Sequence, residues 1–175
     1  MIIVDYDPHW PILCEEEKNR ILEVAGRLIL TIEHIGSTAV PGLAAKPIID
    51  MMAGIRGSSD ADECLPLLAR IGYNHVMPEP GNQEWFYICG KGPHSVGYHL
   101  HLVKYKSSHW NEHLLFRDYL RYHKDVARQY EKLKKRMAEE LGSDREAYTQ
   151  SKDSFIKSVI PVSYTHLTLP TNREV

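Results

Sequence analysis

The chain has 175 residues, a formal net charge of −2 and a pI near 6.5. This length predicts one domain, since domains usually contain about 100–200 residues. The hydrophobic fraction of 43% and the charged fraction of 25% exclude a wholly disordered or collagen-like chain. The near-neutral charge argues against a broad nucleic-acid-binding face. No apolar run approaches the roughly 18 residues that span a bilayer, so we expect no membrane segment.

The cysteines and the start of the chain predict a cytoplasmic protein. Cys14, Cys64 and Cys89 are widely spaced and odd in number, which favours reduced thiols over a disulfide framework or a zinc ribbon. The first ten residues lack the basic and apolar regions of a secretory signal. No sequence pattern indicates an oligomeric state.

The order of predicted elements indicates an α/β or α+β domain. Apolar periodicity and turn residues predict, in chain order, a helix over 7–25, strands over 28–35 and 47–55, a helix over 58–71, strands over 73–77, 84–89 and 97–105, a helix that Ser108 caps and that runs through Tyr119, and helices over 124–141 and 143–160. This order is typical of a mixed β-sheet flanked by helices, with a helical C-terminal part, and not of a repeated βαβ barrel.

The last fourteen residues, VSYTHLTLPTNREV, differ from the rest of the chain. They lack the helical period of the segment before them, and we expect that helix to stop at Pro161. Their first ten letters resemble a reading-frame translation of a transposon adapter used to prepare sequencing libraries. We therefore predict a domain over 1–161 and a non-native, adapter-derived tail over 162–175. The alternative is an ordinary short C-terminal extension.

A glycine–serine turn followed by a carboxylate is the sharpest chemical feature. Gly36, Ser37 and Thr38 follow a predicted strand, and Asp50 lies in the apolar run of the next strand. Glycine allows close backbone approach, and the serine hydroxyl with neighbouring N–H groups can bind a phosphate oxygen. A charge in an apolar strand needs a cation or hydrogen-bond donors, and a divalent metal would serve. The alternative, that Asp50 faces a solvated cleft or caps a loop, is equally compatible with the pattern.

Two histidines are spaced to share one face of a later strand. His99 and His101 are two positions apart, so their imidazoles point to the same side. If their strand neighbours that of Asp50, the three side chains make a workable divalent-metal site. A polar strand face explains the two histidines as well. Glu33 and His34 point to opposite faces, so at most one of them joins such a site.

Basic side chains outside the predicted sheet are candidate phosphate ligands. Lys46 lies in a loop, Arg117 and Arg121 share a helix face, and Lys152 lies on the last helix. Arginine pairs of this kind can clamp phosphates, although each of these residues singly is also explained as a solvated charge. We interpret the run of Lys132, Lys134, Lys135 and Arg136 as a solvated helix face.

Several segments resemble the GrpB family, a nucleotidyltransferase-like family. They are HIGSTAVPGLAAKPIIDMMAGI (34–55), YHLHLVKY (98–105), HLLFRDYLR (113–121), EAYTQSKDSFI (146–156) and the opening VDYDPHWPILCEEEKNRI (4–21). The resemblance covers about residues 2–160 in the same order. It implies a mixed sheet flanked by helices, like the catalytic domain of polymerase-beta-type nucleotidyltransferases. Some family members are fused to a dephospho-coenzyme A kinase.

The resemblance implies an incomplete catalytic motif. In the superfamily, Gly-Ser precedes a strand with Asp-x-Asp or Asp-x-Glu, and a later strand adds a carboxylate; together these hold two divalent ions. Gly36, Ser37 and Asp50 match the first parts. Met52 stands where the second carboxylate would be, and the later strand offers histidines.

We therefore expect a protein that binds a nucleotide or another phosphorylated small molecule with a divalent metal, Mg²⁺ or Mn²⁺. If it is a transferase, it moves a nucleotidyl group to a small acceptor. Gly36, Ser37 and Thr38 would hold phosphate, which Lys46 and Arg117 would neutralise. Asp50, His99 and His101 would bind the metal or move protons. The alternatives are an inactive nucleotide-sensing or scaffold module and a metal-dependent phosphohydrolase.

Overall fold

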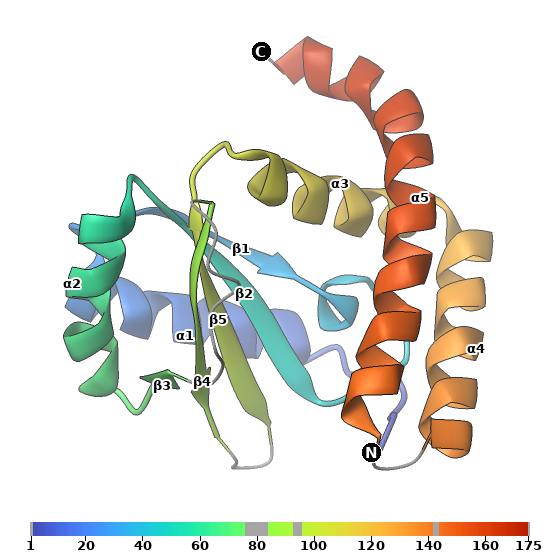
Figure 1. Cartoon of the computed structure of the whole chain (residues 1–175), viewed down its shortest axis with the longest axis horizontal. Coiled ribbons are helices and arrows are strands. Elements are labelled where there is room, and N and C mark those ends of the chain that lie inside the picture. The colour runs from blue at the N-terminus through green and yellow to red at the C-terminus, as the bar shows by residue number, and fades with distance from the viewer. Residues whose placement is uncertain (1, 76–83, 93–95, 142–143, 175) are drawn as a thin grey trace.

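The computed structural model describes residues 2–75, 84–92, 96–141 and 144–174, with backbone alone beyond residue 161. Its elements are α1 (Trp10–Ala25), β1 (Ile29–Ile35), the 3-10 turn η1 (Ser37–Ala39), β2 (Ile48–Ile55), α2 (Ser58–Ala69), β3 (Asn74–His75), β4 (Trp85–Lys91), β5 (Gly97–Lys104), α3 (Ser108–Tyr122), α4 (Lys124–Leu141) and α5 (Arg145–Glu174). The predicted mixed α+β fold is confirmed (Figure 1).

One five-stranded mixed sheet organises the domain. Its strand order is β1-β2-β5-β4-β3, with β2 and β5 parallel and the other neighbours antiparallel. In the register of β2 and β5, Asp50 lies opposite His99 and Met52 lies opposite His101. Because partners across strands share a face and side chains alternate, Asp50, His99 and His101 project from the same face.

The two faces of the sheet carry different helices (Figure 1). The main core joins α1 and α2 to one face, where Trp10, Ile21 and Leu68 pack on strand residues such as Met51 and Leu100. The opposite face packs on α3 through a cluster of Ile35, Met52, Val103 and Trp110. Because side chains alternate along β2, Met51 and Met52 pack in separate clusters. The face that carries Asp50 is the one that α3 packs on.

The loop between η1 and β2 is covered by α4. The carboxylate of Glu131 accepts a hydrogen bond from the backbone N–H of Ala44 at 3.0 Å. A second apolar cluster joins Val40 and Leu43 of the loop to Leu120 of α3 and to Ala127 and Tyr130 of α4. The α5 helix packs against α3 and α4. The segment after Gly36 is thus enclosed by the C-terminal helices.

Two helix boundaries differ from the sequence predictions. The cap of α3 is Ser107, whose Oγ accepts from the N–H of Trp110 at 3.3 Å, so the prediction of Ser108 was wrong by one residue. Pro161 does not end α5, which continues to Glu174. Residues 142–143, where the last helix was predicted to begin, lie outside the described residues. None of the described helices is long and apolar enough to cross a membrane.

Candidate functional site

The carboxylate of Asp50 lies between two imidazoles. Its Oδ1 is 3.5 Å from Nδ1 of His99 and 3.6 Å from Nε2 of His101. The parallel register of β2 and β5 fixes this arrangement, because it sets His99 beside Asp50 and His101 one pleat farther along the same face. The structure therefore brings together the three side chains predicted to bind metal or move protons.

The two histidines set the electrostatics of this carboxylate. Burial raises the pKa of Asp50, but hydrogen bonding from His101 and His99 outweighs it and holds the pKa well below its usual range. Asp50 is therefore an anion at neutral pH. It offers negative charge to a cation or to the proton of an imidazole.

The Gly36–Ser37 turn approaches Asp50 from the end of β1. Gly36 has a φ of 74°, and a Cβ on this residue would stand 2.8 Å from Oδ2 of Asp50. Glycine thus meets two needs here, a left-handed backbone and close contact with a carboxylate. The turn places the Ser37 hydroxyl next to the Asp50 side of the sheet.

Lys134 of α4 reaches the same turn and was missed at the sequence level. Its Nζ donates to Oγ of Ser37 at 2.7 Å and to the carbonyl oxygen of Ala44 at 2.9 Å. The residue is only 3% exposed, so its assignment to a solvated helix face was wrong. Its neighbours Lys132, Lys135 and Arg136 are exposed, as predicted. The signal was present in the helical period, since Ala127, Tyr130 and Lys134 form the buried stripe of α4.

Two further lysines contribute positive charge around Lys134. Burial, together with repulsion from Lys152 and Lys46, lowers the pKa of Lys134 to about 7, although Glu131 and Asp50 act in the opposite direction. Nζ of Lys46, a predicted phosphate ligand, stands 4.3 Å from the ring centroid of Tyr148 on α5. The charges of the predicted candidates Lys46 and Lys152 therefore act on the lysine that contacts Ser37.

Thr38 and the two residues before the turn have different surroundings. Thr38 is buried, and its Oγ1 is 2.9 Å from Nε2 of His34. His34 lies opposite Met51 and therefore faces α1, whereas Glu33 lies opposite Met52 on the Asp50 face. The prediction that at most one of the pair faces the site is confirmed. The role of Thr38 as a phosphate ligand stays a prediction.

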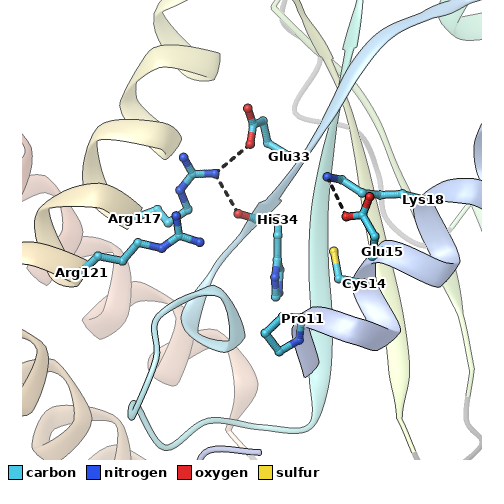
Figure 2. Close-up of a pocket in the computed structure, with 8 residues that line it drawn as sticks. All are labelled: Pro11, Cys14, Glu15, Lys18, Glu33, His34, Arg117 and Arg121. Atoms are coloured by element: carbon cyan, nitrogen blue, oxygen red, sulfur yellow. Dashed lines mark hydrogen bonds and ion pairs between the residues drawn. The ribbon is translucent and has the colours of Figure 1, made fainter. Parts of the chain in front are cut away.

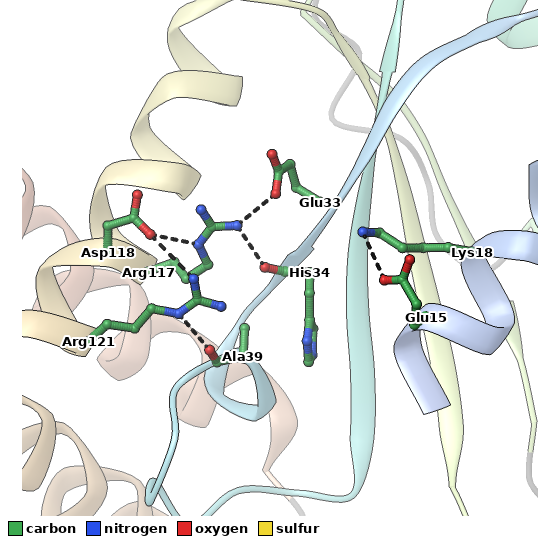
Figure 3. A network of polar contacts seen from close by, with 8 residues as sticks. All are labelled: Glu15, Lys18, Glu33, His34, Ala39, Arg117, Asp118 and Arg121. Carbon is green, nitrogen blue, oxygen red and sulfur yellow. Dashed lines mark hydrogen bonds and ion pairs between the residues drawn. The ribbon is translucent and has the colours of Figure 1, made fainter. Parts of the chain in front are cut away.

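Arg117 lines a separate hollow at the edge of β1, between α1 and α3 (Figure 2). Its guanidinium donates to Oε2 of Glu33 at 3.0 Å, to the carbonyl of His34 at 3.1 Å and to Asp118 at 2.9 Å (Figure 3). Arg121 donates to the carbonyl of Ala39 at 2.9 Å. The hollow has a volume of about 260 Å³ and is lined by Pro11, Cys14, Glu15, Lys18, Glu33, His34, Arg117 and Arg121.

These contacts give Arg117 a structural role. Two carboxylates and a carbonyl already use its donors, and the bonds to Glu33 and His34 fasten α3 to the edge strand. Phosphate binding by Arg117 stays a prediction that would require rearrangement of these pairs.

Histidines of α3 continue the site beyond His101. The ring centroids of His101 and His113 are 6.3 Å apart, and Nε2 of His113 is 2.9 Å from Nε2 of His109. Burial, followed by repulsion from His109 and His101, lowers the pKa of His113 to about 3. His113 is therefore neutral at physiological pH and adds no charge near Asp50.

A divalent metal fits these residues only in part. No group of three or more His, Cys, Asp or Glu side chains that could hold a metal ion occurs within the described part of the chain. Asp50 offers one charged carboxylate, and the position of a second acid is taken by Met52, which is fully buried among apolar side chains. The protein alone thus supplies one hard oxygen ligand, and a cation there needs oxygens from a bound ligand or water.

Comparisons with known proteins agree with this architecture. The family model described as "GrpB protein" matches residues 1–161. The glutamate-rich protein GrpB of Alkalihalophilus pseudofirmus is 32% identical over 163 residues, which cover 91% of this chain and 94% of that protein. The crystal structure of the conserved protein GrpB from Enterococcus faecalis superposes with a TM-score of 0.82 at 34% identity, covering 94% of this chain and 98% of that one.

A more distant structure shares the fold alone. The Cid1 poly(U) polymerase, solved with Mg and 3'-dATP bound, has a TM-score of 0.55 at 11% identity and covers 78% of this chain and 43% of that one. The sheet with Gly36, Ser37 and Asp50 is therefore part of a nucleotidyltransferase-like fold. On the family model and on its relatives at more than 30% identity, the chain belongs to the GrpB family.

Proposed function

We propose that this protein binds a nucleotide, or a similar phosphorylated small molecule, together with Mg²⁺ or Mn²⁺ on the Asp50 face of the sheet. One observation carries the proposal. An anionic carboxylate with two imidazoles lies in contact with a Gly-Ser turn whose hydroxyl is held by a buried lysine. Such a turn suits phosphate oxygens, and the carboxylate suits the cation that accompanies them.

The single carboxylate is compatible with a metal that arrives with its ligand. Mg²⁺ is commonly held by one or two carboxylates plus substrate phosphates, and not by an all-protein cage. Asp50 would supply the protein oxygen, and His99 and His101 would orient it. The fold shared with Cid1, whose structure contains Mg and 3'-dATP, supports the choice of a nucleotide.

Nucleotidyl transfer is the reaction that this arrangement would favour. An acceptor oxygen would form a bond to the α-phosphorus of a nucleoside triphosphate while pyrophosphate leaves with the bridging oxygen. Ser37 would hold a phosphate oxygen, and an imidazole of His99 or His101 would take the acceptor's proton. A bound divalent ion would supply charge stabilisation at the phosphoryl oxygens.

A binding module without transfer is the second candidate. Met52 packs against Ile35, Val103 and Trp110 at the position of the missing acid. A carboxylate in that apolar cluster would be costly, so the second metal ligand of an active transferase has no ready place. Ligand binding without turnover would support this candidate.

A thermal-shift panel tests the proposal. The four ribonucleoside triphosphates are added to the full chain with and without Mg²⁺ or Mn²⁺. A ligand at about 100 times its dissociation constant raises the free energy of unfolding by roughly 2.7 kcal/mol. We expect a metal-dependent shift with at least one nucleotide that is lost in Asp50→Asn.

The matched control is Asp5→Asn, which alters an exposed carboxylate near the N-terminus. It should keep the shift. Equal shifts in Asp50→Asn and the native chain would remove Asp50 from the site, and the absence of any shift would reject this ligand class.

A further inference from the structure

We propose that Lys134, Lys46 and Lys152 form a subsite beside Ser37 for the terminal phosphates of a di- or triphosphate. The inference rests on the proposed function, because it specifies the ligand of the same site. It assigns a role to Lys134, a residue outside every motif of the sequence.

The position of Lys134 is built by three elements. The lysine projects from the buried stripe of α4, and its Nζ contacts Ser37 of η1 and the loop carbonyl of Ala44. Nζ also lies 4.9 Å from the ring centroid of Tyr130, one turn earlier on the helix. An ammonium group has three protons, and two of them are used by Ser37 and Ala44. The third can be donated to a ligand beside Ser37.

The charge of Lys134 lacks a direct counter-charge. No carboxylate of the described residues lies within the 4.0 Å ion-pair distance of its Nζ, and Glu131 instead pairs with Lys135 at 3.0 Å. A buried ammonium without an anion is costly, so folds usually pair it. A phosphate oxygen beside Ser37 would provide the missing anion.

The surrounding charges favour a polyanion. Lys152 and Lys46 both act on Lys134 by repulsion, whereas the opposing carboxylates of Glu131 and Asp50 have partners of their own. Lys134 at the hydroxyl, with the charges of Lys152 and Lys46 acting on it, suits the charge of about −3 to −4 on a pyrophosphate or triphosphate group better than the −2 of a monophosphate. Asp50, which lies close to Gly36 of the turn, would hold the cation that accompanies such phosphates.

Proton uptake is a consequence that a purely structural lysine would not share. The groups facing Lys134 are Ser37 and Lys46 near the turn, Asp50 of β2, Tyr130 and Glu131 of its own helix, and Lys152 of α5. Burial, with repulsion from Lys152, lowers the pKa of Lys134 to about 7. An anion bound against Nζ would raise this pKa again, so binding near pH 7 should take up protons.

The test is calorimetric titration of inorganic tripolyphosphate into the full chain, without divalent metal and at fixed ionic strength. We expect tripolyphosphate to bind at least 10-fold more tightly than orthophosphate. Lys134→Met and Lys152→Met should each weaken it at least 10-fold. Lys135→Met, an exposed lysine one position along α4, should bind as the native chain does.

A second variant and the measurement of proton uptake complete the test. If Lys134→Met does not fold, Lys152→Met still tests the subsite, because no hydrogen bond to another described residue is seen for Lys152. Titrations in buffers of different ionisation enthalpy should show proton uptake in the native chain and less in Lys134→Met. Native-like affinity and proton uptake in both variants would overturn the subsite. Since this titration omits metal, that failure would leave the Asp50-dependent nucleotide shift untouched, and the proposed function would stand or fall separately.

Discussion

Two buried charges, one on each side of the sheet, are treated differently by this fold. Glu17 of α1 is fully buried, and its carboxylate accepts from Tyr73 at 2.7 Å, from Arg20 at 2.8 Å and from Lys91 at 3.1 Å. Lys134 of α4 is buried almost as deeply, yet its ammonium meets a hydroxyl, a carbonyl and an aromatic ring.

We interpret the Glu17 charge as structural and propose a ligand-binding role for the Lys134 charge. The network of Glu17 is complete within the chain, so it needs no ligand and ties α1 to the far strands of the sheet. The ammonium of Lys134 has two hydrogen-bond acceptors and no carboxylate partner among the described residues. We infer that the α1 side of the sheet stabilises the fold and that the other side is prepared for an anion.

The largest expected effect is on the structural charge. Glu17→Gln should lower the free energy of unfolding by about 3–5 kcal/mol, because it removes one partner of a buried ion pair and leaves the ammonium of Lys91 without its counter-charge. Chemical denaturation measures the change. The adjacent exposed residue gives the control, since Glu16→Gln should cost under about 0.5 kcal/mol. A loss for Glu17→Gln as small as that control would contradict the structural reading.

Acid should lower the free energy of unfolding because His34, a buried neutral histidine that faces α1, is protonated more readily in the unfolded chain. Burial, with repulsion from Arg121, lowers the pKa of His34 to about 4, from the usual histidine value of 6.5. Between these values the unfolded chain binds more protons, so stability falls as pH drops from 6.5 and levels below about 4. The contribution is about 3 kcal/mol.

Replacing His34 tests this dependence. The free energy of unfolding of His34→Gln, measured from pH 7 to pH 4, should fall less steeply than that of the native chain. His9→Gln, at a side chain that is 77% exposed, should leave the slope unchanged. A native slope in His34→Gln would mean that His34 is protonated in the fold.

Two glycines with positive φ test how closely the turn packs on Asp50. Gly36 and Gly42 both have positive φ, 74° and 83°, but only a Cβ on Gly36 would meet the Asp50 carboxylate. Gly42→Ala should cost about 1 kcal/mol for backbone strain alone. Gly36→Ala should cost more, about 2 kcal/mol, and should also abolish the metal-dependent nucleotide shift. Equal effects of the two substitutions on stability and binding would contradict close packing of the turn on Asp50.

Replacing Lys134 should have the smallest effect on the free energy of unfolding. In the absence of ligand, Lys134→Met loses two hydrogen bonds, each worth about 1 kcal/mol, and removes an unpaired buried ammonium. These changes oppose each other, so the free energy of unfolding at pH 7 should stay within about 1 kcal/mol of the native value in urea titrations. A loss above about 3 kcal/mol, like that of Glu17→Gln, would make Lys134 a structural charge and erase the contrast.

The sequence predicted those parts of the site that local geometry determines. Strand alternation sufficed to set His99 and His101 on one face, and the Gly-Ser pattern marked the turn beside Asp50. Their convergence also required β2 and β5 to be neighbours, which the sequence allowed without requiring. These contacts follow from period and register.

The remaining parts depend on contacts across long stretches of chain. The bond from Lys134 to Ser37 spans 97 positions, and that from Arg117 to Glu33 spans 84. Local charge patterning made Lys134 look solvated, and it offered Arg117 a neighbour on its own helix but not the distant Glu33. In the folded protein, helix packing buries Lys134 and brings Arg117 into contact with β1. The partners of Lys134 and Arg117 are set by tertiary packing, and no local pattern in a single sequence predicts them.

A metal–phosphate site on the Asp50 face is tested most directly by paramagnetic broadening by Mn²⁺ of the histidine ring signals in NMR spectra, with and without ATP. We predict that Mn²⁺ with ATP broadens the signals of His99 and His101 and leaves that of the exposed His9 sharp. This selectivity should be lost in Asp50→Asn. A metal–phosphate site on this face would be contradicted if His99 and His101 broadened no more than His9. It would also be contradicted if the selective broadening survived in Asp50→Asn.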